Sequence, residues 1–143
     1  MTEERLGELP PRYSFALNQH AEMRCTRCPQ CEQPMRLRKF ALLIGIENYG
    51  MTVLGKTCRF CPRCEFIIAH QDELEALLAA SFATHQPDMV GNDYYVIGTV
   101  ERKVWRRGMR DATTHAEVLR HAADFAKEFD LHYEPGGWYP KDS

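Results

Sequence analysis

The cysteines are the feature that most limits how this chain can fold. All six lie in two short blocks, Cys25 to Glu32 and Cys58 to Glu65, and both blocks read Cys-x-x-Cys-Pro-x-Cys-Glu. Closely spaced cysteines in a chain that shows no secretion signal are typical of metal ligands, whereas scattered cysteines in a secreted chain are typical of disulfides. The repeat therefore predicts a metal site built from both blocks.

The spacing within each block suits a tetrahedral ion. Two cysteines separated by two residues can place both thiolates on one ion, and a proline after the first of them fixes φ and stiffens the turn. Two such turns supply four sulfurs, the ligand set that zinc prefers. The pairs that contain the proline are the preferred ligands, which gives the set Cys28, Cys31, Cys61 and Cys64.

Six cysteines leave a second ligand set open, because one tetrahedral site needs only four. The alternative set is Cys25, Cys28, Cys58 and Cys61. In the preferred set, Cys25 and Cys58 are the surplus residues, and the repeat makes them equivalent. Two interpretations of them remain: small buried hydrophobic side chains, or spare thiols for redox chemistry or metal exchange.

The sequences Cys-Pro-Gln-Cys at 28–31 and Cys-Pro-Arg-Cys at 61–64 resemble the knuckles of the zinc-ribbon, or rubredoxin-like, fold group. The resemblance covers about residues 21–68, and the whole chain is also similar to small uncharacterised bacterial zinc-ribbon proteins. We therefore expect an α+β fold, with antiparallel zinc-ribbon β-hairpins and a packed C-terminal helix and strand unit. The fold group serves many functions, so the resemblance implies no particular activity.

Zinc, one ion per chain, is the expected cofactor, and iron is the alternative. Rubredoxins resemble this spacing and carry one iron on four thiolates, which would make the chain an electron-transfer protein. Their pattern has glycine after the second cysteine of each pair, however, where this chain has Glu32 and Glu65. An iron–sulfur cluster of the bacterial ferredoxin type would need a further cysteine followed by proline after each block, and the sequence has neither.

A catalytic metal site is disfavoured by the same residues. His20 and His115 each begin a His-x-Glu sequence like that of zinc deaminases, but those enzymes place a proline before the cysteine pair, where this chain has Arg27 and Phe60. Four cysteines also complete the coordination sphere and leave no position for a reacting water. The sequence therefore favours a non-enzymatic protein with a structural site.

The resemblance implies a zinc ribbon at 21–68, preceded by an N-terminal extension at 1–20 and followed by a C-terminal α+β unit at 69–143, which either stands apart from the ribbon or forms one compact domain with it. Tyr13, Phe15 and Leu17 alternate, which indicates a short strand or a clamp over the ribbon. The predicted elements are strands at 35–46 and 51–59, a helix at 71–83, a strand at 94–104, a helix at 115–129, a short strand at 131–133 and an aromatic latch at 138–140.

Charge is distributed in blocks, although the net charge is only −2. Residues 66–101 contain carboxylates but no lysine or arginine, whereas residues 102–110 contain cations but no carboxylate. Cations beside an aromatic ring suit nucleic acid. The candidate contacts for nucleic acid are Arg36, Arg38, Lys39, Arg59, Arg102, Lys103, Trp105, Arg106 and Arg107.

Protein partners are the alternative for these charges. The basic run can pair with the acidic segments of its own chain or of a second copy, which would make the protein an interaction module or a homo-oligomer. The longest apolar run, Phe40 to Ile46, is too short to cross a membrane, and no signal peptide follows Met1. We therefore expect a cytoplasmic protein without membrane contact.

Overall fold

The computed structural model describes residues 8–20, 26–84, 86–101, 120–134 and 137–142, and for Asp130, 132–134 and 137–142 it describes the backbone alone. Four predictions lie wholly or partly outside these residues: the position of Cys25, the end of the strand at 94–104, the basic run at 102–110, and the first part of the helix at 115–129.

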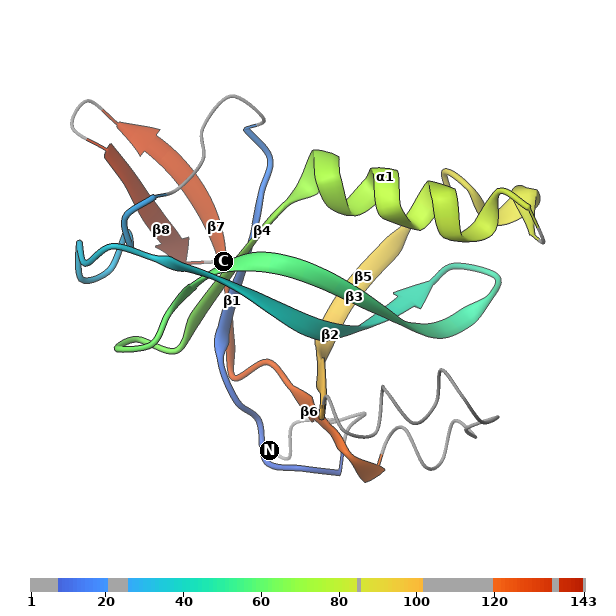
Figure 1. Ribbon diagram of the computed structural model, residues 1–143, viewed down its shortest axis with the longest axis horizontal. Helices are drawn as coiled ribbons and strands as arrows, with labels where there is room; N and C mark the ends of the chain where they lie inside the picture. The colour runs from blue at the N-terminus through green and yellow to red at the C-terminus, as the bar shows by residue number, and fades with distance from the viewer. Residues whose placement is uncertain (1–7, 21–25, 85, 102–119, 135–136, 143) are drawn as a thin grey trace.

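Strands dominate the described residues, which form an eight-stranded sheet in the order β6-β5-β2-β3-β4-β1-β7-β8. One α-helix, α1, and one 3₁₀ helix, η1, accompany the sheet in the described part of the chain (Figure 1). The elements are β1 (Ser14–Asn18), β2 (Arg36–Ile46), β3 (Gly50–Cys61), β4 (Phe66–His70), α1 (Gln71–Phe82), η1 (Pro87–Met89), β5 (Tyr94–Val100), β6 (Ala122–Asp124), β7 (Lys127–Glu134) and β8 (Gly137–Asp142).

The α+β class is confirmed, and the sheet that contains the predicted antiparallel hairpin is mixed rather than purely antiparallel. The β2–β3 hairpin pairs antiparallel from Arg36 opposite Phe60 to Ile46 opposite Gly50, as the sequence predicted. β1, however, lies between β4 and β7 and runs parallel to both. Strands from all three of the segments expected from the sequence therefore share one mixed sheet.

The sheet rolls round on itself because β6 and β7 lie near opposite ends of the strand order yet are almost continuous in the chain. Only Phe125 and Ala126 separate them. The Phe125 N–H donates to the Ile97 carbonyl of β5, and the Ala126 N–H donates to the Tyr13 carbonyl just before β1. This short connection brings the two sides of the sheet together, as the course of β5, β6 and β7 shows (Figure 1).

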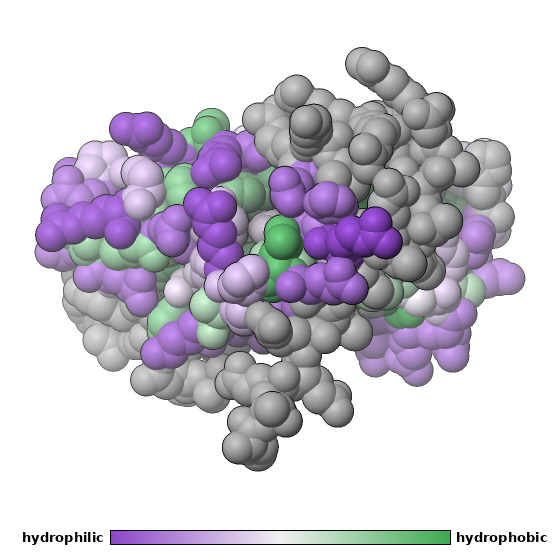
Figure 2. Space-filling view, turned by 90° about the horizontal axis from the view of Figure 1, so that it is seen from below, coloured by the Kyte–Doolittle hydropathy of each residue, from purple (hydrophilic) through white to green (hydrophobic). Residues whose placement is uncertain are grey.

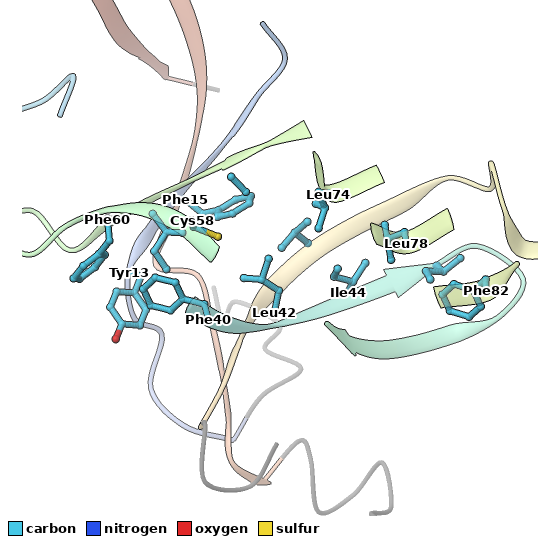
Figure 3. Packing of buried hydrophobic residues seen from close by; sticks show 14 residues of the cluster. Tyr13, Phe15, Phe40, Leu42, Ile44, Cys58, Phe60, Leu74, Leu78 and Phe82 are labelled. Atoms are coloured by element: carbon cyan, nitrogen blue, oxygen red, sulfur yellow. The ribbon is translucent and has the colours of Figure 1, made fainter. Parts of the chain in front are cut away.

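The main hydrophobic core lies on the inner face of the rolled sheet, under α1. Alternate residues of β2, namely Phe40, Leu42 and Ile44, point into it, and α1 covers them with buried Leu74, Leu78 and Phe82 (Figure 3). Each such side chain contributes about 1.5–3 kcal/mol when fully buried. The predicted helix at 71–83 is confirmed.

Smaller clusters lie on the opposite face of the sheet. One contains Phe66 and Ile68 of β4 with Cys28, Cys61 and Phe129, and it surrounds the candidate metal centre. Since Ile67 and Ala69 of β4 belong to the main core, β4 is buried on both faces. Viewed from below, hydrophilic side chains dominate the described surface, with small hydrophobic areas between them (Figure 2).

The helix predicted at 115–129 is wrong from residue 122 onward. Arg120 is helical, but Ala122–Asp124 and Lys127–Glu134 are strands. The helical spacing of Phe125 and Phe129 has another cause: Phe125 stacks on Phe15 with ring centroids 4.4 Å apart, whereas Phe129 packs against Phe66 on the other face. Pairing with β5 and β1 outweighs the local helical pattern.

The remaining strand predictions are met with shifted limits. The strand expected at 94–104 is described over β5, and the short strand at 131–133 forms the middle of β7. Residues 138–140, expected to act as a latch, lie in β8 and pair with β7. Among the described residues, no helix is long and apolar enough to cross a membrane.

Candidate metal centre

Four cysteine sulfurs converge on the outer face of the sheet. The Sγ atoms of Cys28, Cys31, Cys61 and Cys64 all lie within 4.8 Å of one another. Cys31 and Cys61 approach to 3.5 Å and Cys28 and Cys64 to 3.9 Å, and the four thiols are free. A tetrahedral ion with metal–sulfur bonds of about 2.3 Å has sulfur–sulfur edges of about 3.8 Å. The cluster therefore has the dimensions of a site for one ion.

The first knuckle comes directly before β2 and is closed by its own backbone. The Cys28 N–H donates to the Gln33 carbonyl and the Glu32 N–H donates to the Cys28 carbonyl, both at 2.8 Å. The Gln30 N–H lies 3.4 Å from the Cys28 sulfur and donates to it. Amides that point at the sulfurs stabilise the thiolate form, which is the form that binds metal.

The second knuckle is the turn between β3 and β4. Cys61 is the last residue of β3 and pairs with Phe66, the first residue of β4, while Cys64 lies in the turn between them. The Ser14 N–H donates to the Glu65 carbonyl, which ties this turn to β1. Three distant parts of the chain therefore meet at the cysteine cluster.

The two knuckles share a backbone feature at the same position of the sequence repeat. Glu32 and Glu65, the residues after the last cysteine of each block, have φ values of 64° and 51°. This left-handed conformation favours glycine because a Cβ atom crowds the following carbonyl. Glycine adopts this conformation most readily, and glutamate adopts it here in both knuckles.

Glu32→Gly is expected to stabilise the protein by about 0.5–1 kcal/mol, because it relieves the left-handed strain at a small cost in unfolded-chain entropy. Urea denaturation of both proteins with metal bound measures the difference. Asn48→Gly is the matched control: Asn48 also has a positive φ, 65°, but asparagine tolerates it well, so little change is expected. Destabilisation by Glu32→Gly would show that the glutamate side chain has a role of its own.

Burial and backbone amides set the protonation of the four thiols. Burial raises the pKa of Cys28 to about 11 and also raises the pKa of Cys64, because both thiolates would lose water. The Gln33 backbone N–H lowers the pKa of Cys31 to about 7 by donating to its sulfur. Metal binding must therefore displace protons, and metal affinity is expected to rise with pH.

Cys58 lies away from this cluster. Strand alternation places it on the opposite face of β3 from Cys61, where it is 1% exposed in the main core and contacts the Lys56 carbonyl at 3.5 Å. Burial raises the pKa of its thiol to about 12. The alternative ligand set is incompatible with this position, because Cys58 and Cys61 cannot share one ion from opposite faces of a strand.

The predicted nucleic-acid contacts that the structure describes lie on two faces of the β2–β3 hairpin. Arg36, Arg38 and Lys39 are exposed, and Arg59 is half-buried. Alternation along the strands puts Arg36 and Arg38 on the face of Phe40, and Lys39 and Arg59 on the other. The other predicted contacts, Arg102, Lys103, Trp105, Arg106 and Arg107, lie outside the described residues.

The Arg38 guanidinium lies on aromatic rings, 4.8 Å from the centre of Phe40 and 5.1 Å from that of Phe60. Arg12, which sequence analysis did not select, lies 4.5 Å over the Tyr13 ring and pairs with Glu65 at 3.3 Å. Both arginines border one hollow of about 560 Å³. Arg12 belongs to no sequence motif, so only the structure shows that it lies near Arg38.

Comparison of this chain with protein-family models, with curated proteins and with solved structures finds no match. The function must therefore be argued from the site itself.

Proposed function

We propose that this protein binds one zinc ion at Cys28, Cys31, Cys61 and Cys64, and that the zinc is structural. The observation that carries the proposal is the sulfur geometry, with distances of 3.5 and 3.9 Å between paired sulfurs. Four thiolates suit zinc and leave no coordination position for a reacting water. A cluster of several irons would hold the ligand sulfurs further apart, because each iron takes its own ligands.

The role of such an ion follows from what the cysteines connect. Cys28 and Cys31 belong to a knuckle with few apolar residues, whereas Cys61 and Cys64 belong to the turn that joins the buried ends of β3 and β4. An ion bound by both pairs fixes the first knuckle to the sheet and so sets where β2 begins. Metal binding then supplies folding free energy that this polar segment cannot obtain from apolar burial.

Elemental analysis of the purified native protein, with its absorbance spectrum, tests the proposal. We expect one zinc per chain and no visible absorbance. Bound iron with visible absorbance would contradict a structural zinc site and would support an electron-transfer protein at the same cysteines. A chain that contains no metal and gains no stability when zinc is added would overturn the metal site altogether.

We further propose that the β2–β3 hairpin contacts a nucleic acid. Support comes from four consecutive exposed residues at the start of β2: Arg36, Leu37, Arg38 and Lys39, of which Leu37 is 65% exposed. Cations on both faces of this part of the hairpin can reach phosphates, while an exposed apolar side chain can contact a base. The first knuckle adjoins this segment, so the zinc would position the cationic strand.

Titration with single-stranded and duplex oligonucleotides at two salt concentrations tests this interface. We expect binding at low salt that weakens as salt rises, and the double variant Arg36→Gln/Lys39→Gln is expected to reduce the salt slope by about two. Lys127→Gln on β7 is the matched control, because it removes an exposed cation that lies elsewhere in the sheet.

Absence of binding at low salt would exclude nucleic acid as the partner. A protein-interaction or homo-oligomeric module would then be the better proposal, and the molar mass at high protein concentration would test the self-assembling form. If Lys127→Gln weakened nucleic-acid binding as much as Arg36→Gln/Lys39→Gln does, the attraction would be a non-specific effect of the net surface charge.

A further inference from the structure

A cavity of about 750 Å³ lies at the end of the rolled sheet that α1 covers, on the other side of the sheet from the cysteine cluster. It is bordered by β1, β2, α1, the segment from η1 to β5, and β7. Its volume falls in the range of about 300–1,000 Å³ that small-molecule sites have, and the mouth of a barrel-like sheet is a common place for such sites.

The floor of this cavity is apolar. Phe15 and Leu17 of β1, Ile46 of β2, and Leu78 and Phe82 of α1 line it. All five belong to the main core or pack against it, so the floor is a rigid surface that continues the interior of the protein. An apolar group placed there would lose contact with water without requiring the core to rearrange.

The rim of the cavity is polar and acidic. The Tyr94 hydroxyl donates to Glu75 at 2.9 Å, and the Gln71 amide donates to the same carboxylate oxygen at 2.8 Å. On the opposite side, the Tyr95 hydroxyl donates to Glu128 at 2.6 Å. The bond to Glu128 raises the pKa of Tyr95 to about 12, so this hydroxyl remains a neutral donor at physiological pH. Glu75 and Glu128 therefore each accept hydrogen bonds from uncharged groups of the rim.

The charge of the lining has one sign. Glu75, Asp93 and Glu128 are acidic, and among the described residues that border the cavity there is no lysine, arginine or histidine. A cation is attracted both by these carboxylates and by the faces of the neighbouring tyrosine rings. An anion would meet three carboxylates, and a neutral apolar molecule would gain nothing from them.

We propose that this cavity is a binding site for a small amphipathic organic cation, with the apolar body on the Phe15, Leu78 and Phe82 floor and the ammonium group at the Glu75 and Glu128 rim. The cavity supplies the volume, and the lining supplies complementary charge. This site is independent of the metal centre and of the nucleic-acid interface.

Isothermal titration calorimetry of the full chain with benzyltrimethylammonium tests the proposal. The probe combines a quaternary ammonium with one aromatic ring, and 3-phenylpropionate is a matched anion of similar size. We expect the cation to bind with a Kd of about 1 mM or lower and the anion to bind at least about tenfold more weakly, because the carboxylates favour only the cation.

Two variants locate the binding site. The double variant Glu75→Gln/Glu128→Gln removes both charges but keeps side chains of the same size that can still form hydrogen bonds. We expect it to lower the affinity for the cation at least about tenfold. Ala79→Leu fills part of the cavity with a larger side chain from α1, and we expect it to lower the affinity for both probes. Asp72→Asn is the control, since Asp72 lies on the same helix but does not border the cavity.

Metal content and melting temperature, measured for each variant, confirm that it is folded. No binding of either probe to the unaltered chain would overturn the site. Equal affinity for cation and anion, or an effect of Asp72→Asn as large as that of the double variant, would overturn the assignment to a cation.

Discussion

Replacing Cys61 with serine is expected to remove the bound metal and to lower the free energy of unfolding by at least about 3 kcal/mol. Structural zinc contributes about 10–16 kcal/mol of binding free energy in small zinc domains, and a serine hydroxyl is a poor substitute for a thiolate. Cys61 is fully buried at the junction of β3 and β4, so the loss also affects the packing of Phe66 and Ile68. Metal content and the thermal unfolding midpoint measure the two effects, and the midpoint should fall by about 10 °C.

Cys58→Ser is the matched control for that variant. It makes the same chemical change three residues earlier in β3, at a position that is also buried, but on the opposite face of the strand. The control is expected to keep its metal while losing some stability from the buried hydroxyl. Cys64→Ser should lose metal like Cys61→Ser, and Cys25→Ser should retain it. Retention of metal in Cys64→Ser together with its loss in Cys58→Ser would reinstate the alternative ligand set.

The cluster of four cysteines was the part of this protein that the sequence predicted best, because the information that specifies it is local. Each knuckle is a short segment in which cysteine spacing and proline determine the turn. The choice between Cys58 and Cys64 rested only on the position of the proline. Strand alternation decides it in the structure, and the limits of β3 were needed to apply that argument.

The fold was predicted where hydrophobic periodicity and tertiary pairing agree, and missed where they conflict. They agree at the β2–β3 hairpin and at α1, because each of these elements buries the one face on which its hydrophobic residues recur regularly. Residues 122–129 read equally well as a helix, yet β6 and β7 gain backbone partners in β5 and β1 that no local pattern reveals. The parallel position of β1 depends on the same non-local pairing.

Buried polar groups could not be predicted from the sequence patterns for a related reason. Lys56 of β3 is 5% exposed, and its ammonium donates to Glu73 of α1 at 2.9 Å. The composition of β3 gives no sign of this pair, because the partner lies on an element that only the fold brings near. The acidic rim at Glu75 and Glu128 was missed in the same way, since it joins α1 to β7 across the cavity.

Gly98→Ala is expected to destabilise the protein by about 3 kcal/mol or more, the second-largest effect that the structure predicts. A Cβ atom at Gly98 would lie 2.0 Å from the Ala123 carbonyl oxygen and 2.8 Å from the Asp124 Cα atom, so it would collide with the backbone of β6. Backbone atoms cannot rotate away as side chains do, and β5 and β6 would have to separate. The glycine at this position of β5 thus has a physical cause, the close approach of a second backbone.

Gly45→Ala, on β2, is the control for this variant. Its Cβ atom would lie 3.4 Å from the Ile97 side chain, which can adjust, so we expect a change of at most about 1 kcal/mol. Urea denaturation of both variants measures the difference. Because β6 continues into β7, separation of β5 from β6 would open the rolled sheet and expose the core beneath Phe125. Gly98→Ala should therefore unfold at lower urea than Gly45→Ala, and equal stability of the two would mean that the sheet does not close through β6.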